Sequence, residues 1–72
     1  MRYTIELVTL NADGSLSRQD VGGAMRRDAA SRTAESIAAE QAASLGGEVF
    51  SSPSYWGVAD ADGKVLANVF IR

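Results

Sequence analysis

The stretch Val65-Leu66-Ala67-Asn68-Val69-Phe70-Ile71 decides the fold, because six of its seven side chains are apolar. A strand that is apolar on both faces belongs in the middle of a sheet or is covered on both sides. Residues 55–59 precede it across the turn Asp60-Ala61-Asp62-Gly63, which predicts a hairpin. We therefore expect residues 65–71 to form the central strand, between residues 55–59 and the first strand of the chain.

The first strand is predicted over residues 2–10, where side chains alternate in the two-residue period of a strand with one packed face. Its inward-facing set is Tyr3, Ile5 and Leu7. Val8 and Leu10 break the alternation, because they place apolar groups on the face that also holds Glu6. This face is therefore not the polar surface that a solvated sheet presents.

A single helix is predicted from about Ala24 to Leu45. Its apolar stripe, at spacings of three and four, is Ala30, Ala34, Ile37, Ala38, Gln41 and Leu45. Gly46-Gly47 supplies the expected left-handed stop, and Gly22-Gly23 is expected to break any element before the helix. Either Asp20 or Asp28 is a candidate cap.

These elements predict one α+β domain over residues 1–72, with β-α-β-β order and a three-stranded antiparallel sheet that carries one helix on one face. Residues 11–15 are expected to form a turn, and the segment that begins at Leu16 is expected to be a loop or a brief edge strand. Residues 48–52 lead into Pro53, which cannot donate to a central ladder.

The second face of the sheet is the informative feature, because one helix covers only one face. By strict alternation the covered face takes the first strand's inward set with Val65, Ala67, Val69 and Ile71. The second face holds Val8, Leu10, Leu66, Asn68 and Phe70. An uncovered apolar face on a small domain indicates an interface, so these residues are candidate partner-binding residues. The alternative is that residues 11–25 fold back over this face, with Leu16, Val21 and Met25 as the cover.

The hairpin register decides where Trp56 lies. A two-residue Asp62-Gly63 turn places Trp56 and Val58 in the core, and Tyr55 then joins the partner-binding residues. A four-residue turn with a glycine bulge moves both Trp56 and Val58 to the second face, beside Leu66 and Phe70. The core placement is favoured, because it separates apolar from polar side chains better.

Composition excludes several classes of function. The chain has no cysteine and no histidine, so a structural zinc site and a Ser-His-Asp triad are ruled out. The Asp60-x-Asp62-Gly63 pattern resembles the start of a calcium loop, but Lys64 occupies the position where a further ligand is needed. We expect no metal, no cofactor and no catalytic residues.

The only basic concentration is Arg26, Arg27 and Arg32, together with Arg18. These arginines are candidate contacts for an acidic partner, or for a nucleic-acid backbone with Tyr55 or Trp56 as a stacking group. A solvated helix face is the more common explanation for such a group of arginines. The net charge of −2 disfavours a nucleic-acid partner.

The element order is shared by many unrelated small domains, so it names no family. We expect a small non-enzymatic protein-interaction module that binds and blocks another protein, of the kind frequent among phage and mobile-element accessory proteins. A structural homodimer through the second face and a nucleic-acid-binding accessory protein are the alternatives. No apolar stretch approaches the roughly 20 residues that span a bilayer, and residues 1–6 lack a secretory apolar run. We expect a cytoplasmic protein with no membrane partner.

Overall fold

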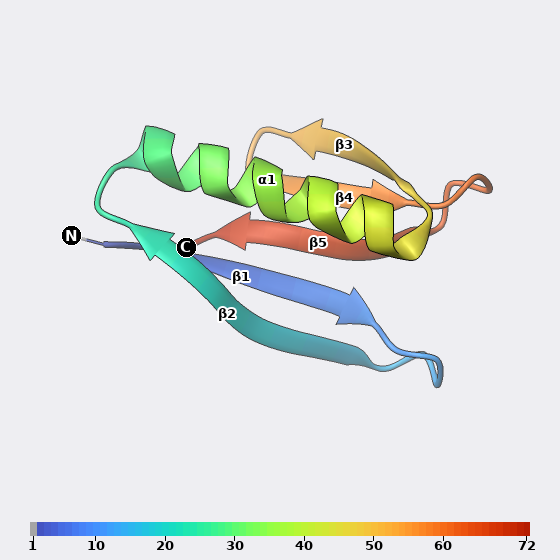
Figure 1. Cartoon of the computed structure of the whole chain (residues 1–72). Helices are drawn as coiled ribbons and strands as arrows, with labels where there is room; N and C mark the ends of the chain where they lie inside the picture. Colours follow the sequence, from blue (N-terminus) through green and yellow to red (C-terminus); the bar gives the residue numbers. More distant parts are fainter. Residues whose placement is uncertain (1) are drawn as a thin grey trace.

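Five strands and one helix succeed one another along the chain in the computed structural model, which describes residues 2–72. They are β1 (Tyr3–Leu10), β2 (Leu16–Ala24), α1 (Arg27–Leu45), β3 (Glu48–Ser52), β4 (Tyr55–Ala59) and β5 (Val65–Ile71). The strands form one sheet in the order β2-β1-β5-β4-β3, and every neighbouring pair is antiparallel. Helix α1 lies across one face of this sheet (Figure 1).

The predicted three-stranded sheet is wrong, because β2 and β3 extend it on both sides to five strands. Both are edge strands, held by backbone hydrogen bonds to β1 and β4 and not by an apolar pattern of their own. Gly22 and Gly23 lie within β2 and do not interrupt it. Pro53 lies in the turn after β3, outside the ladder. The predicted central position of residues 65–71 is confirmed, since β5 lies between β1 and β4.

Helix α1 begins at Arg27, three residues later than predicted, because Ala24 still pairs with Tyr3 at the end of β2. Neither aspartate candidate is the N-cap residue, which is Arg26 and makes no side-chain capping hydrogen bond; Asp28 lies in the first turn, where its Oδ1 accepts from the Ala29 N–H at 2.9 Å. The predicted stop is confirmed: Gly46 adopts φ 72°, in the left-handed region, and its N–H donates to the carbonyl of Ala42.

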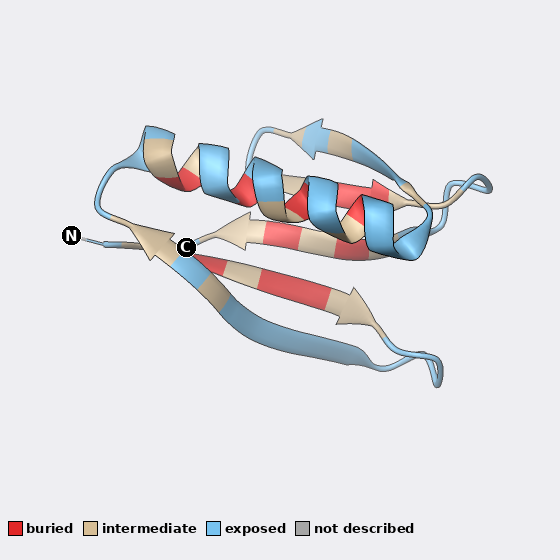
Figure 2. Ribbon diagram, in the orientation of Figure 1, coloured by how far each residue is buried: buried red, intermediate tan, exposed pale blue. Residues whose placement is uncertain are grey.

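The core lies between α1 and the three central strands. The helix contributes only alanines to the buried residues of the core, which are Ala30, Ala34, Ala38 and Ala42. Ile5, Val58 and Val69 are the largest fully buried side chains and all come from the sheet. Figure 2 shows this buried layer on the inner side of α1 and along β1, β4 and β5. Trp56 packs against the core, so its favoured placement is confirmed.

The β4–β5 turn reaches that register by an unexpected route. Asp60 N–H donates to the carbonyl of Lys64, which closes a three-residue turn ending at Gly63 with φ 82°. Val58 pairs with Ala67 while Ala59 pairs with Val65, so Leu66 is an extra residue in β5. Because of this extra residue, Trp56 pairs with Val69 and its side chain lies on the core face of the sheet. The bulge also leaves Val65 42% exposed, which contradicts its predicted core position.

Candidate functional site

The sheet face opposite α1 is the candidate site, and we call it the open face. Cross-strand pairing fixes its central row: Phe50, Gly57, Asn68, Val8 and Arg18, one residue from each strand. The neighbouring row toward the hairpin turns contains Leu66, Leu10 and Leu16, and the row on the other side contains Tyr55, Phe70 and Glu6. The open face therefore contains every partner-binding residue predicted from the sequence.

No other segment of the described chain lies over this face, but its side chains shield one another: Val8 is only 5% exposed, and Leu10, Leu66, Asn68 and Phe70 are half-buried. The alternative cover, residues 11–25, forms a turn and strand β2, which pairs edge to edge with β1. Leu16 and Met25 are 58% and 71% exposed, and Val21 packs against the core beneath α1. The alternative is wrong, because backbone pairing extends the segment beside the sheet and not over it.

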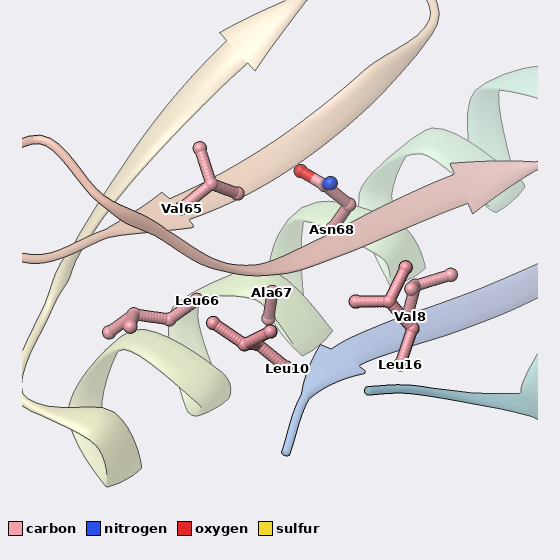
Figure 3. A pocket seen from close by; sticks show the side chains of 7 residues that line it. All are labelled: Val8, Leu10, Leu16, Val65, Leu66, Ala67 and Asn68. Carbon is pink, nitrogen blue, oxygen red and sulfur yellow. The ribbon is translucent and has the colours of Figure 1, made fainter. Parts of the chain in front are cut away.

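The leucine row surrounds a shallow hollow of about 200 Å³ near the turn end of the sheet. Its lining residues are Val8, Leu10, Leu16, Val65, Leu66, Ala67 and Asn68, and Figure 3 shows them from close by. This volume is below the ~300 Å³ or more of typical small-molecule sites. The hollow is suited to receiving one or two apolar side chains.

An aromatic group lies on the β3–β4 side of the open face. The Phe50 and Tyr55 rings meet edge to face with centroids 6.1 Å apart, and the Tyr55 and Phe70 centroids are 5.4 Å apart. All three residues are half-buried. Aromatic side chains that are already held by neighbours lose little further entropy when a partner covers them, and such residues are frequent anchors of interfaces.

The charged side chains of the open face are the ion-paired Glu6, Arg18 and Arg72, with exposed Asp20 beside Glu6 on β2 and exposed Glu48 at the β3 edge. Arg72 donates to Glu6 Oε1 from Nη2 at 2.8 Å and from Nε at 3.1 Å, and Arg18 Nη1 lies 3.4 Å from the same oxygen. The hydrogen bond from Arg72 is the main cause that lowers the pKa of Glu6. The Glu6 carboxylate is therefore matched within the chain, and the leucine row carries a charge only at its β3 end, where Glu48 pairs with Ala59.

Asn68 carries the one buried side-chain oxygen or nitrogen atom among residues 2–72 that lacks a hydrogen-bond partner. Its Oδ1 is buried and has no hydrogen-bond partner among residues 2–72. A buried acceptor without a donor costs about 1–3 kcal/mol. Asn68 lies in the middle of β5, the central strand, so this cost falls at the centre of the open face.

Sequence reasoning missed three contributors to the face. Phe50 comes from β3, which was not predicted, Leu16 comes from β2, which was expected only as a loop or a brief edge strand, and Val65 turns outward at the bulge. The β-forming pair Val49-Phe50 was the available signal for β3, because a proline just after a short strand does not exclude an edge strand.

Of the four arginine candidates, Arg18 lies on the open face and the other three lie on or beside α1. Arg26 and Arg27 are exposed at the start of α1, where Arg27 lies 5.9 Å from the centroid of the Tyr3 ring. Arg32 is exposed and lies 3.8 Å from Asp28 on the helix surface. Trp56 packs against the core while Tyr55 is on the open face. The structure therefore does not bring these arginines together with both aromatic candidates.

Comparison with protein-family models, curated proteins and solved structures finds no match for this chain. Among residues 2–72, no group of three or more acidic side chains is arranged to hold a metal ion. No helix in that range combines the length and the apolar character needed to cross a membrane.

Proposed function

We propose that the chain is a non-enzymatic protein-interaction module whose open face is the docking surface. The observation that carries the proposal is the uncovered face itself: a five-stranded sheet with α1 on one side and leucine and aromatic rows on the other. A sheet face exposed to water is normally polar, whereas an extended apolar face indicates an interface. In this proposal the open face covers part of the partner protein's surface and blocks that surface from other contacts.

The layout of the face supports this function. The leucine row and the aromatic group lie on either side of the central row, the Glu6–Arg72 pair lies at the end of the face near the chain termini, and Arg18 lies at its β2 edge. Interfaces have the same anatomy, with an apolar centre and a polar rim. The small hollow among the leucines gives a partner side chain a place to insert.

Affinity capture with purified chain variants tests the proposal. Leu66→Asp and Phe70→Asp place a carboxylate in the docking surface, and each is expected to abolish retention of a partner from an extract of the source cells. Leu45→Asp is the matched control, because Leu45 is an exposed leucine on α1, in the other layer of the molecule. Circular dichroism verifies that all variants keep the helix.

A protein retained by the wild type and by Leu45→Asp, but lost with both open-face variants, supports the docking surface once the purified protein shows the same ranking in a direct titration. Equal retention by all four chains contradicts it. The arginines at the start of α1 provide a separate control, since replacing Arg26 with Gln is expected to leave capture unchanged.

A further inference from the structure

The geometry points to a second copy of this chain as the occupant of the open face, in a two-fold dimer centred on Asn68. This inference rests on the proposed function, because it names the partner of the same face. It follows from the position of Asn68, from the distribution of charge around it and from the area of the face.

Asn68 is central in both directions. It is the middle residue of β5, and β5 is the middle strand of the sheet. In a symmetric face-to-face dimer the two-fold axis lies between the two sheets, and a residue on the axis faces its own copy. A two-fold axis through the centre of the face therefore places Asn68 opposite the partner's Asn68.

A carboxamide is complementary to itself, because it carries both an acceptor oxygen and a donor NH₂ group. Stacked sheets lie about 10 Å apart, and each asparagine carboxamide reaches about 3.5 Å from its Cα. Two facing side chains leave about 3 Å between them, which is the length of an N–H···O hydrogen bond. The pairing supplies the donor that Asn68 Oδ1 lacks in the single chain, and the soft terminal torsion of asparagine lets the group turn outward.

Charge selects the direction of the axis. An axis along β5 puts the β2–β1 side of one protomer over the β4–β3 side of its partner. Arg18 then faces the partner's Phe50, and Glu6 faces the hydroxyl of the partner's Tyr55, which are favourable contacts. An axis across the strands would instead stack Arg18 on the partner's Arg18, and facing like charges oppose association.

The area is sufficient for a stable dimer. Five strands spaced about 4.8 Å apart and about seven residues long give a face of roughly 24 Å by 24 Å. Two such faces bury about 1,150 Å² before the relief of the side chains is counted, above the ~1,000 Å² that a specific interface must exceed and near the ~1,200 Å² lower end of stable ones. The net charge of −2 per chain adds little repulsion between copies.

Sedimentation equilibrium from about 1 µM to about 500 µM tests the dimer directly, and the wild type is expected to change from monomer to dimer with concentration. Asn68→Asp and Asn68→Lys each place like charges across the axis, so each is expected to raise the dissociation constant at least about 100-fold. An equimolar mixture of the two is expected to restore association as a heterodimer, because position 68 of one chain meets position 68 of the other.

Ser36→Asp and Ser36→Lys, on the exposed surface of α1, are the controls and are expected to leave the dissociation constant unchanged. If either Asn68 variant loses its circular dichroism spectrum, Leu66→Asp with Leu66→Lys replaces the pair, since Leu66 also lies on β5 along the axis. A wild type that dimerises without rescue in the mixtures overturns the placement of the axis.

A wild type that stays monomeric at the highest concentration overturns the dimer. The proposed function then stands or falls separately on the capture experiment, because a foreign partner lost with Leu66→Asp would still identify the open face as the docking surface. Failure of both experiments removes the open face from any binding role.

Discussion

At the residue scale, Gly57 and Phe50 show how the open face is packed. Gly57 is buried in β4 and pairs with Phe50 across the β3–β4 ladder. A Cβ added at Gly57 would overlap the end of the Phe50 ring, so the ring occupies the space that a side chain would take. The glycine is therefore required by close approach of the ring, and it fixes the position of one of the three aromatic residues.

We expect Gly57→Ala to lower the free energy of unfolding by about 1–3 kcal/mol, the usual cost of overpacking. In a Phe50→Ala background the same change is expected to be neutral or stabilising, because alanine is better than glycine in a strand interior once the ring is gone. Urea unfolding of the four chains at one protein concentration measures this coupling. Equal costs in the two backgrounds would show that the ring does not limit the site.

Asn68 is the second residue of the open face whose surroundings are unusual. Every other member of the central row either packs apolar surface, carries an exposed charge or lacks a side chain. Only Asn68 holds a buried acceptor without a donor among the described residues. A lone polar group in an apolar interface is a known means of fixing register and partner number, and this is the role inferred for the asparagine pair.

At the element scale, α1 is an alanine helix that lies close against the sheet. Ala30, Ala34 and Ala38 are fully buried, and the large core side chains come from the strands. A helix that presents only methyl groups lets its backbone approach the sheet but leaves no room for larger residues. The shape of the core is thus set by the absence of bulk on the helix.

Ala38→Leu is expected to destabilise the chain by about 1–3 kcal/mol, because the added atoms must push α1 away from the sheet. The matched control is Ala39→Leu, one position along on the exposed surface, where a change within about 0.5 kcal/mol is expected. Thermal unfolding followed by circular dichroism separates the two, since 1 kcal/mol shifts Tm by roughly 4–8 °C at this size. Similar losses in both variants would mean that leucine disturbs α1 itself and not its packing.

At the scale of the whole molecule, the ion pairs of Glu6 connect the two ends of the chain. Arg72 lies 66 positions away in the sequence, yet its guanidinium is hydrogen-bonded to Glu6 on the neighbouring strand, and Arg18 reaches the same oxygen from β2. The Glu6 side chain is only 17% exposed. The terminal residue is thereby fixed to the sheet.

The free energy of unfolding is expected to decrease as the pH is lowered, and part of this decrease comes from the Glu6 carboxyl. The hydrogen bond from Arg72 lowers the pKa of Glu6 in the folded chain below its ordinary value of 4.5. The stabilisation that Glu6 provides is therefore complete at pH values above 4.5, and it is lost as the pH falls through the lowered pKa that Glu6 has in the folded chain. Asp13, whose pKa is lowered by its hydrogen bonds with Ser15, acts with the same sign.

The comparison that checks this is urea unfolding at a series of pH values from neutral to about pH 2, because stability rises with pH wherever the unfolded chain binds more protons. Glu6→Gln is expected to flatten the acid limb in part, and Arg72→Gln should act in the same direction, with little further effect when the two are combined. An acid limb that is identical in wild type and Glu6→Gln would assign the dependence to Asp13 and the remaining carboxylates.

Part of this molecule was predictable because the signal is local. The central position of β5 follows from its own apolar run, the end of α1 from Gly46, and the membership of the open face from alternation along β1 and β5. Each depends on a periodicity or a backbone preference of a few successive residues. Those physical causes act within one segment, so the sequence determines them by itself.

The rest was decided by tertiary structure, because its causes lie in a neighbouring strand. Strands β2 and β3 are stabilised by backbone hydrogen bonds to β1 and β4, which any side-chain pattern permits. The bulge at Leu66 results from matching the turn to the β4–β5 ladder, and it alone turned Val65 outward. Only the assembled sheet placed Asn68 at the centre of an uncovered face, since a residue acquires a position in a face when its neighbours on both sides are paired.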